Sequence, residues 1–189
     1  MEHEHTTRSA TKGRWQLLGL ALVFFGPLLA AYFLYFSDSL DRDSVNYGEL
    51  LSPPVSLDAK LHFDTGLRGR WTLWVMPGQR CDKACTDALV TISQVRLATG
   101  REIDRIERAL LVSGDDALVA NSDAHPGLHV FARNGHLGNA VATALDPLTM
   151  GHIYIMDPLG NVMMRYPFAP ERKPMLGDLK KLLKFSRIG

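Results

Sequence analysis

The sequence contains very little cysteine: Cys81 and Cys85 are the only two in 189 residues. Small secreted domains that depend on disulfides carry several pairs, so a disulfide-built scaffold is excluded. A bridge between two residues so close in the chain would enclose a very small loop and stabilise the fold only weakly. We therefore expect the pair to serve chemistry rather than stability.

An excess of charge is also missing. The formal net charge is +1 at pH 7, with 21 basic and 20 acidic residues, so no overall field favours nucleic acid as a partner. A Ser-His-Asp set, a glycine-rich phosphate loop, paired catalytic carboxylates and internal repeats are not found either. Beyond one hydrophobic segment and the arm before it, roughly 150 residues remain, enough for a single globular domain.

That hydrophobic segment covers residues 15–37, which include no charged residue. As a helix it would be about 35 Å long, enough to cross the hydrocarbon core of a bilayer, which is about 30 Å thick. Trp15 at one end and Tyr32 and Tyr35 at the other suit the two membrane interfaces. A cleaved signal peptide would have a shorter apolar core that ends in small residues, whereas here aromatic residues continue past Ala31. The segment predicts one transmembrane helix.

Flanking charges predict the orientation of this helix. Three cations precede it, namely Arg8, Lys12 and Arg14. Residues 38–43 after it hold three aspartates and one arginine. The positive-inside rule then places the arm of residues 1–14 in the cytoplasm and the rest of the chain on the far side. We expect a single-pass protein of a bacterial inner membrane with a periplasmic C-terminal domain, where a disulfide can persist.

Residues 38–57, which include Pro53-Pro54, predict a linker, and residues 58–189 a compact domain. The apolar run at residues 70–76 predicts a buried strand, and a helix should follow from about residue 82 to 99. Further elements are expected at residues 108–113, 115–120, 128–131, 137–145, 152–156, 162–166 and, as a closing helix, about 176–185. Strand, helix and strand followed by a hairpin and a helix predict an α/β domain.

The two cysteines lie where the predicted strand passes into the helix. Cys81 would sit at the helix N-terminus, where unpaired N–H groups stabilise a thiolate, and Arg80 and Lys83 favour the same charge state. Positions i and i+4 share one face, so the two sulfurs can form a disulfide or bind a soft ion such as Cu(I). Cys81 and Cys85 are the candidate catalytic residues and candidate metal ligands.

His152, just before the predicted hairpin, is the candidate third metal ligand. Met150 beside it could offer a thioether, although methionine more often fills a core. Three other histidines of the domain read as polar residues of loops. They are His125, His129 and His136.

On these residues the sequence resembles the Sco/SenC family. The likeness covers a short arm, one span, a tether, Trp71-Thr-Leu-Trp-Val-Met76, Cys81-Asp-Lys-Ala-Cys85 and Ile153-Tyr-Ile-Met-Asp-Pro-Leu-Gly160. It implies a thioredoxin-like domain preceded by one N-terminal transmembrane helix. It also implies copper as the cofactor, bound by two cysteines and a histidine. The copper-bearing subunit of cytochrome c oxidase, or another periplasmic thiol protein, would be the partner.

Two positions depart from the family pattern. Thr86 stands where the family usually has a proline after the second cysteine, and Thr149 stands where it has its ligand histidine. His152, three residues further on, is the nearest substitute.

Three functions stay open at this point. The chain could be an assembly factor that binds and passes on Cu(I), or a thiol–disulfide oxidoreductase in which Cys81 attacks and Cys85 resolves the mixed disulfide. It could also be a scaffold whose cysteines only form a resting disulfide. A copper carrier needs a donor beyond the two sulfurs, whereas an oxidoreductase needs none.

Overall fold

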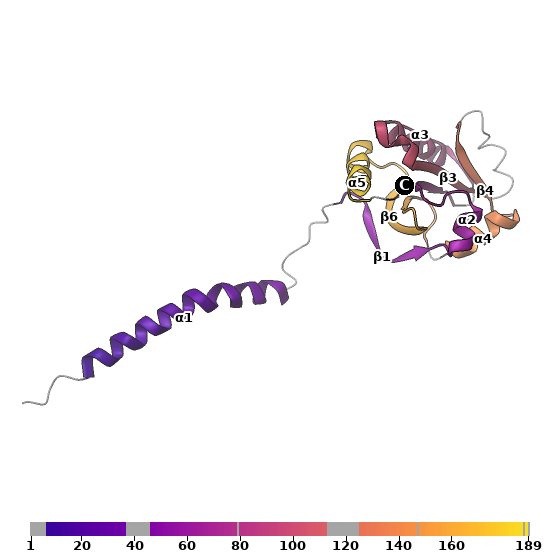
Figure 1. Cartoon of the computed structure of the whole chain (residues 1–189). Coiled ribbons are helices and arrows are strands. Elements are labelled where there is room, and N and C mark those ends of the chain that lie inside the picture. Colours follow the sequence, from indigo (N-terminus) through magenta and orange to yellow (C-terminus); the bar gives the residue numbers. More distant parts are fainter. Residues whose placement is uncertain are drawn as a thin grey trace, which may run out of the picture. The chain divides into compact units, whose positions relative to one another are not determined.

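The computed structural model describes residues 7–36, 46–78, 80–112, 125–146, 148–186 and 188. The chain divides into two compact units, Met1–Val45 and Asn46–Gly189 (Figure 1). The predicted element at residues 115–120 lies outside the described residues.

The first unit contains helix α1 (Thr7–Phe36). Its stretch Gly13–Ala30 has a mean hydropathy of 1.4 and is long and apolar enough to cross a membrane. Trp15, Phe24 and Phe33 are all exposed, which suits a helix whose neighbours are lipid tails. Pro27 lies inside the helix without ending it. The predicted spanning helix is therefore present.

The second unit is built on a mixed sheet which, over the described residues, has six strands in the order β1-β6-β5-β2-β3-β4. The strands are β1 (Glu49–Ser56), β2 (Trp71–Met76), β3 (Ile106–Val112), β4 (Leu128–Ala132), β5 (His152–Met156) and β6 (Asn161–Pro167). Strands β2, β3 and β4 are parallel, and β5, β6 and β1 are antiparallel to their neighbours. Every residue of β2 is buried, as its continuous apolar run predicts.

Helices cover both faces of this sheet (Figure 1). On one face lie α3 (Lys83–Leu97) and α5 (Arg172–Phe185), and on the other lie α2 (Ala59–Asp64) and α4 (His136–Ala144). A short 3₁₀ helix, η1 (Gly100–Arg105), links α3 to β3. We call the side of α3 and α5 the first face and the side of α2 and α4 the second face.

Successive strand residues point to opposite faces, so each strand contributes to two apolar cores. In β2, Leu73 and Val75 belong to the core under the first face, and Trp74 and Met76 to the core under the second. Both cores exclude solvent at this strand, since all four of these side chains are fully buried. The same alternation in β5 decides which candidate ligands can meet.

The predicted linker of residues 38–57 is wrong in its second half, because Glu49–Ser56 pairs with β6 as an edge strand. Pro53-Pro54 argued against a strand, yet the pairing is interrupted between Leu50 and Val55, where no ladder N–H is needed. The strand is also fastened at its start. The Gly48 N–H donates to the buried Asp178 carboxylate at 2.9 Å, and a Cβ on Gly48 would lie 2.4 Å from the Tyr166 ring.

Candidate functional site: paired cysteines at a strand-to-helix turn

The candidate site lies beyond the C-terminal end of the central strand. Strand β2 ends at Met76, Pro77-Gly78 turns the chain, and Cys81 comes just before helix α3. Cys81 and Cys85 form a disulfide with their Cα atoms 5.0 Å apart. The expected proximity of the two sulfurs is therefore found.

Asp82 sets where the helix begins. It is the N-cap of α3, and its carboxylate accepts a hydrogen bond from the Cys85 N–H at 3.0 Å. Cys81 thus precedes the cap, whereas Cys85 lies in the first helical turn. From the sequence, Asp82 is expected only to favour the helix dipole near the helix start, whereas the structure makes it the cap itself.

The two cysteines differ in exposure. Cys85 is fully buried in the first-face core, together with Ala88 and Leu89 of the same helix. Cys81 is half-buried and packs against the edge of that core. A thiol or disulfide partner would therefore meet the pair at Cys81, and Cys85 would be reached only through it.

A hollow of about 400 Å³ opens beside the pair, lined by Gly78, Arg80, Asp82, Gly151 and Phe168. Gly151 comes from the loop before β5 and is held there because its N–H donates to the Met76 carbonyl at 2.7 Å. Its φ of +81° favours glycine at this position. The hollow combines a cation, a carboxylate, an aromatic ring and glycine backbone.

His152, the candidate third ligand, is not brought to the cysteines. It pairs with Met76 in the register of β5 and β2. Ile153 and Ile155 enter the first-face core with Cys85, so His152 shares the second face with Tyr154. The ring centroids of His152 and Tyr154 are 6.1 Å apart, and the His152 Nδ1 lies 2.9 Å from the Met150 carbonyl oxygen.

Thr149, at the position of the family histidine, also belongs to the second face. Its Oγ1 accepts a hydrogen bond from Arg165 at 3.0 Å, and its carbonyl accepts one from the Tyr154 hydroxyl at 2.5 Å. Arg165 in turn binds Glu49, and this hydrogen bond lowers the pKa of the Glu49 carboxyl. These groups form a polar cluster that engages Thr149 away from the disulfide.

The other candidate ligands have separate surroundings. Met150 accepts a hydrogen bond from Arg133 at its sulfur, and His129 lies 3.5 Å from the Glu107 carboxylate. Burial lowers the pKa of His125, and nearby Arg108 acts in the same direction. His136 opens helix α4. Among the described residues, no group of three or more His, Cys, Asp and Glu side chains could hold a metal ion.

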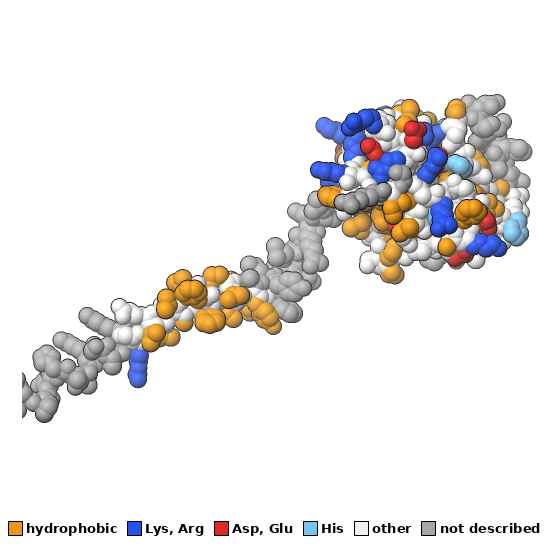
Figure 2. Space-filling view, in the orientation of Figure 1, with side chains coloured by type: hydrophobic (Ala, Val, Ile, Leu, Met, Phe, Trp, Pro, Cys, Tyr) orange, Lys and Arg blue, Asp and Glu red, His pale blue; other side chains and the backbone are white. Residues whose placement is uncertain are grey.

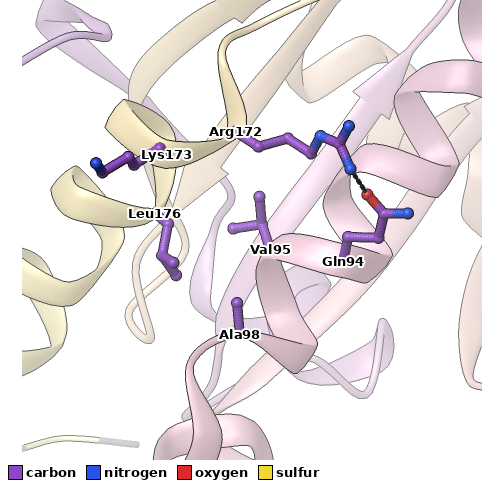
Figure 3. A pocket seen from close by; sticks show the side chains of 6 residues that line it. All are labelled: Gln94, Val95, Ala98, Arg172, Lys173 and Leu176. Carbon is purple, nitrogen blue, oxygen red and sulfur yellow. Dashed lines mark hydrogen bonds between the residues drawn. The ribbon is translucent and has the colours of Figure 1, made fainter.

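A second hollow, of about 370 Å³, lies between α3 and α5 (Figure 3). It is lined by Gln94, Val95, Ala98, Arg172, Lys173 and Leu176, and Arg172 reaches across it to hydrogen-bond Gln94. Its lining offers neither a thiol nor a carboxylate. The cysteine pair is therefore not part of this hollow.

A strand, a redox pair at the following turn and helices on both faces point to a thioredoxin-like domain. A family profile described as "Transmembrane-like, thioredoxin-like, C-terminal domain" matches residues 71–186. The chain belongs to this family. A companion profile, "Transmembrane-like, N-terminal domain", matches residues 8–38, so α1 anchors this transmembrane-like, thioredoxin-like protein to a membrane. A comparison with curated proteins finds no match.

Solved structures of Sco proteins share the fold of this family member. Copper-bound Sco1 of yeast is 14% identical with a TM-score of 0.52, covering 65% of this chain and 81% of that one. Copper-bound ScoI of Arabidopsis thaliana is 13% identical with a TM-score of 0.52, covering 65% and 89%. Copper-bound ScoI of Bradyrhizobium japonicum is 20% identical with a TM-score of 0.50, covering 62% and 88%. The predicted thioredoxin-like fold and the resemblance to Sco proteins are confirmed.

Proposed function

We propose that this protein is a membrane-anchored thiol–disulfide exchange factor that acts outside the cytoplasm on a partner in cytochrome c oxidase assembly. The half-buried Cys81 bonded to the buried Cys85 is the observation that carries this proposal. The Sco-like fold and the membrane anchor support the setting. The partner would be the copper-bearing subunit of the oxidase or another periplasmic thiol protein.

In the reaction, the reduced pair transfers two electrons to a disulfide of the partner. The Cys81 thiolate attacks one partner sulfur, and the other leaves as a thiolate and takes up a proton. The Cys85 thiolate then attacks the Cys81 sulfur, which closes the Cys81–Cys85 disulfide and releases the second partner thiol. A dithiol donor reduces the pair again for the next cycle.

The surrounding residues prepare the pair for these steps. Asp82 holds the Cys85 backbone in the first turn of α3, so the resolving sulfur stays next to Cys81. Backbone N–H groups at the start of α3 and the Arg80 cation favour the thiolate form. Arg80 also lines the hollow in which the partner segment would lie.

Copper delivery is the second candidate, because the three Sco structures similar in fold hold copper. Once reduced, Cys81 and Cys85 would offer two soft sulfur ligands, which Cu(I) prefers. With His152 on the second face, the described residues fit a two-sulfur site. Cu(I) would then be a cargo that moves to an acceptor by ligand exchange.

The two functions separate in paired assays on the reduced full-length chain in lipid nanodiscs. We expect the chain to reduce a disulfide-containing peptide with the sequence of an oxidase copper site, Cys81→Ser to abolish turnover, and Cys85→Ser to accumulate the mixed disulfide. Competition with a Cu(I) chelator measures the second function. Tight Cu(I) binding without peptide turnover would replace the first proposal by the second, and neither activity would leave a scaffold with a resting disulfide.

A further inference from the structure

Helix α5 carries charge of a single sign on its exposed side. Its cations are Arg172, Lys173, Lys180, Lys181 and Lys184. Its acid, Asp178, is only 2% exposed and binds the Gly48 N–H and the Tyr166 hydroxyl. A helix whose exposed side only contacts water is more stable when that side carries charges of both signs, because opposite charges one turn apart attract and like charges repel. Lys180 and Lys184, one turn apart, show the opposite arrangement.

The positive surface continues onto η1. A hollow of about 470 Å³ between the two elements is lined by Arg101, Glu102, Arg105, Lys180 and Lys184 among others. Arg105 engages Glu102 at 2.6 Å and also donates to the carbonyls at the end of α5. The acid in this lining is therefore already neutralised.

The remaining cations of the hollow are Arg101, Lys180 and Lys184. Within the described part of the domain, no ion pair involves Arg101, Lys180 or Lys184. Figure 2 shows Lys and Arg side chains gathered over the part of the domain where α5 lies, with acidic side chains among them. By contrast, Lys83 at the start of α3 pairs with Asp87 at 2.6 Å.

Exposed apolar side chains lie at the same end of the domain. Ile188 is 50% exposed, and its carbonyl accepts a hydrogen bond from Arg105 at 3.0 Å. Phe185, the last residue of α5, is 82% exposed. Lysines on one side of a helix with an exposed aromatic residue at its end are typical of helices that lie on a lipid surface.

We propose that this surface, formed by Arg101, Lys173, Lys180 and Lys184 and edged by Phe185 and Ile188, binds the phosphate headgroups of anionic phospholipids. Charge complementarity supports it, since no ion pair among the described residues engages Arg101, Lys180 or Lys184. The membrane anchor also keeps a bilayer within reach of the domain. Residues 37–48 join α1 to β1, and a chain of that length reaches at most about 40 Å when fully extended.

This contact would leave the redox pair accessible. The hollow follows the C-terminal end of α3, whereas Cys81 precedes the N-terminal end of the same helix. A helix of 15 residues is about 22 Å long. Lipid bound at one end of α3 therefore does not cover the cysteines at the other.

The test measures acetylation rates of individual lysines by mass spectrometry, on the full chain in nanodiscs. We expect Lys180 and Lys184 to react at least threefold more slowly in discs with 30% phosphatidylglycerol than in pure phosphatidylcholine discs, and 0.5 M NaCl to remove this protection. Lys60, an exposed lysine near Asp58 and Asp64, is the internal control and should react equally in both. Equal rates for Lys180 and Lys184 in both discs would overturn the proposal.

Two further experiments test whether the bound phosphate belongs to a lipid or to a free ion, and whether Lys180 contributes to the binding surface. Inorganic phosphate added to phosphatidylcholine discs should not protect; protection equal to that by phosphatidylglycerol would mean a site for phosphate ions rather than a lipid contact. Lys180→Glu should abolish the protection of Lys184, whereas the matched Lys60→Glu should preserve it. Both positions are exposed, so neither change disturbs the core. Protection of Lys184 that persists in Lys180→Glu would also contradict the proposal.

Discussion

The two faces of the sheet are formed by the same strands but carry different side chains and helices. The first face holds the disulfide, α3 and α5, with Leu73 and Ile153 beneath them. The second face holds Trp74, Tyr154 and the polar cluster around Thr149 and Arg165. His152 and Ile153 are adjacent in sequence, yet they belong to opposite faces. Strand alternation, rather than nearness in sequence, therefore decides which donors can surround one ion.

The largest expected effect tests whether the two faces are chemically separate. Cys85→Ser should weaken Cu(I) binding by the reduced chain at least 100-fold, because one of two sulfur ligands is lost. His152→Ala should change it less than twofold, because the imidazole lies on the second face. Chelator competition measures both. A His152→Ala loss as large as that of Cys85→Ser would unite the two faces in one site.

The attachment of β1 to the rest of the domain can be broken at Gly48. Gly48→Ala should destabilise the domain by about 1–3 kcal/mol, because its Cβ would meet the Tyr166 ring at 2.4 Å. Gly177→Ala is the matched control, since its Cβ meets nothing within 4 Å on helix α5 and should stabilise by about 0.5–1 kcal/mol. Chemical denaturation followed by near-ultraviolet circular dichroism measures both, and equal signs would refute this account of Gly48.

Asp82 tests how firmly the first face positions its redox pair. Asp82→Ala should cost about 1 kcal/mol of unfolding free energy, because the Cys85 N–H loses its acceptor. Asp87→Ala breaks only the exposed pair with Lys83 and should cost about 0.5 kcal/mol or less. If the two variants unfold at the same denaturant concentration, Asp82 does not act as a cap.

The smallest expected effect concerns His125, just before β4. Its pKa is lowered by burial and by Arg108, so below about pH 6.5 the unfolded chain binds more protons than the folded one. Stability should fall as the pH drops through this window, by about half a kcal/mol or less because solvent screens the half-buried ring. His125→Asn should flatten that decline and leave the stability at pH 8 unchanged, which denaturation at pH 8 and 5.5 would check.

Much of the domain was predictable because its elements carry strong local patterns. The run 71–76, the helix after Cys81 and the hairpin around Asp157-Pro158 appear close to where the sequence placed them. Strand β1 was missed because Pro53-Pro54 is a sound argument against a regular ladder, and only the interrupted pairing with β6 accommodates it.

The position of His152 was harder to foresee than that of the cysteines. Cys81 and Cys85 are close in the chain, so local geometry alone brings their sulfurs together. The side on which His152 lies depends on the register between β5 and β2, two strands far apart in the sequence, and a shift of one residue would reverse it. The spacing of residues along the sequence does not determine the register between two distant strands, so it could not predict the face of His152.

The small size of the loop closed by the disulfide has a consequence for how the protein is stored and used. Since the bridge joins the residue before the N-cap to the first turn of α3, four positions along the chain, we expect its opening to free almost no chain and Cys85 to stay among its apolar neighbours. We therefore expect the oxidised and reduced molecules to share one architecture. Under the proposed function, electrons would enter and leave through Cys81 without any unfolding, so each cycle would leave the protein ready for the next.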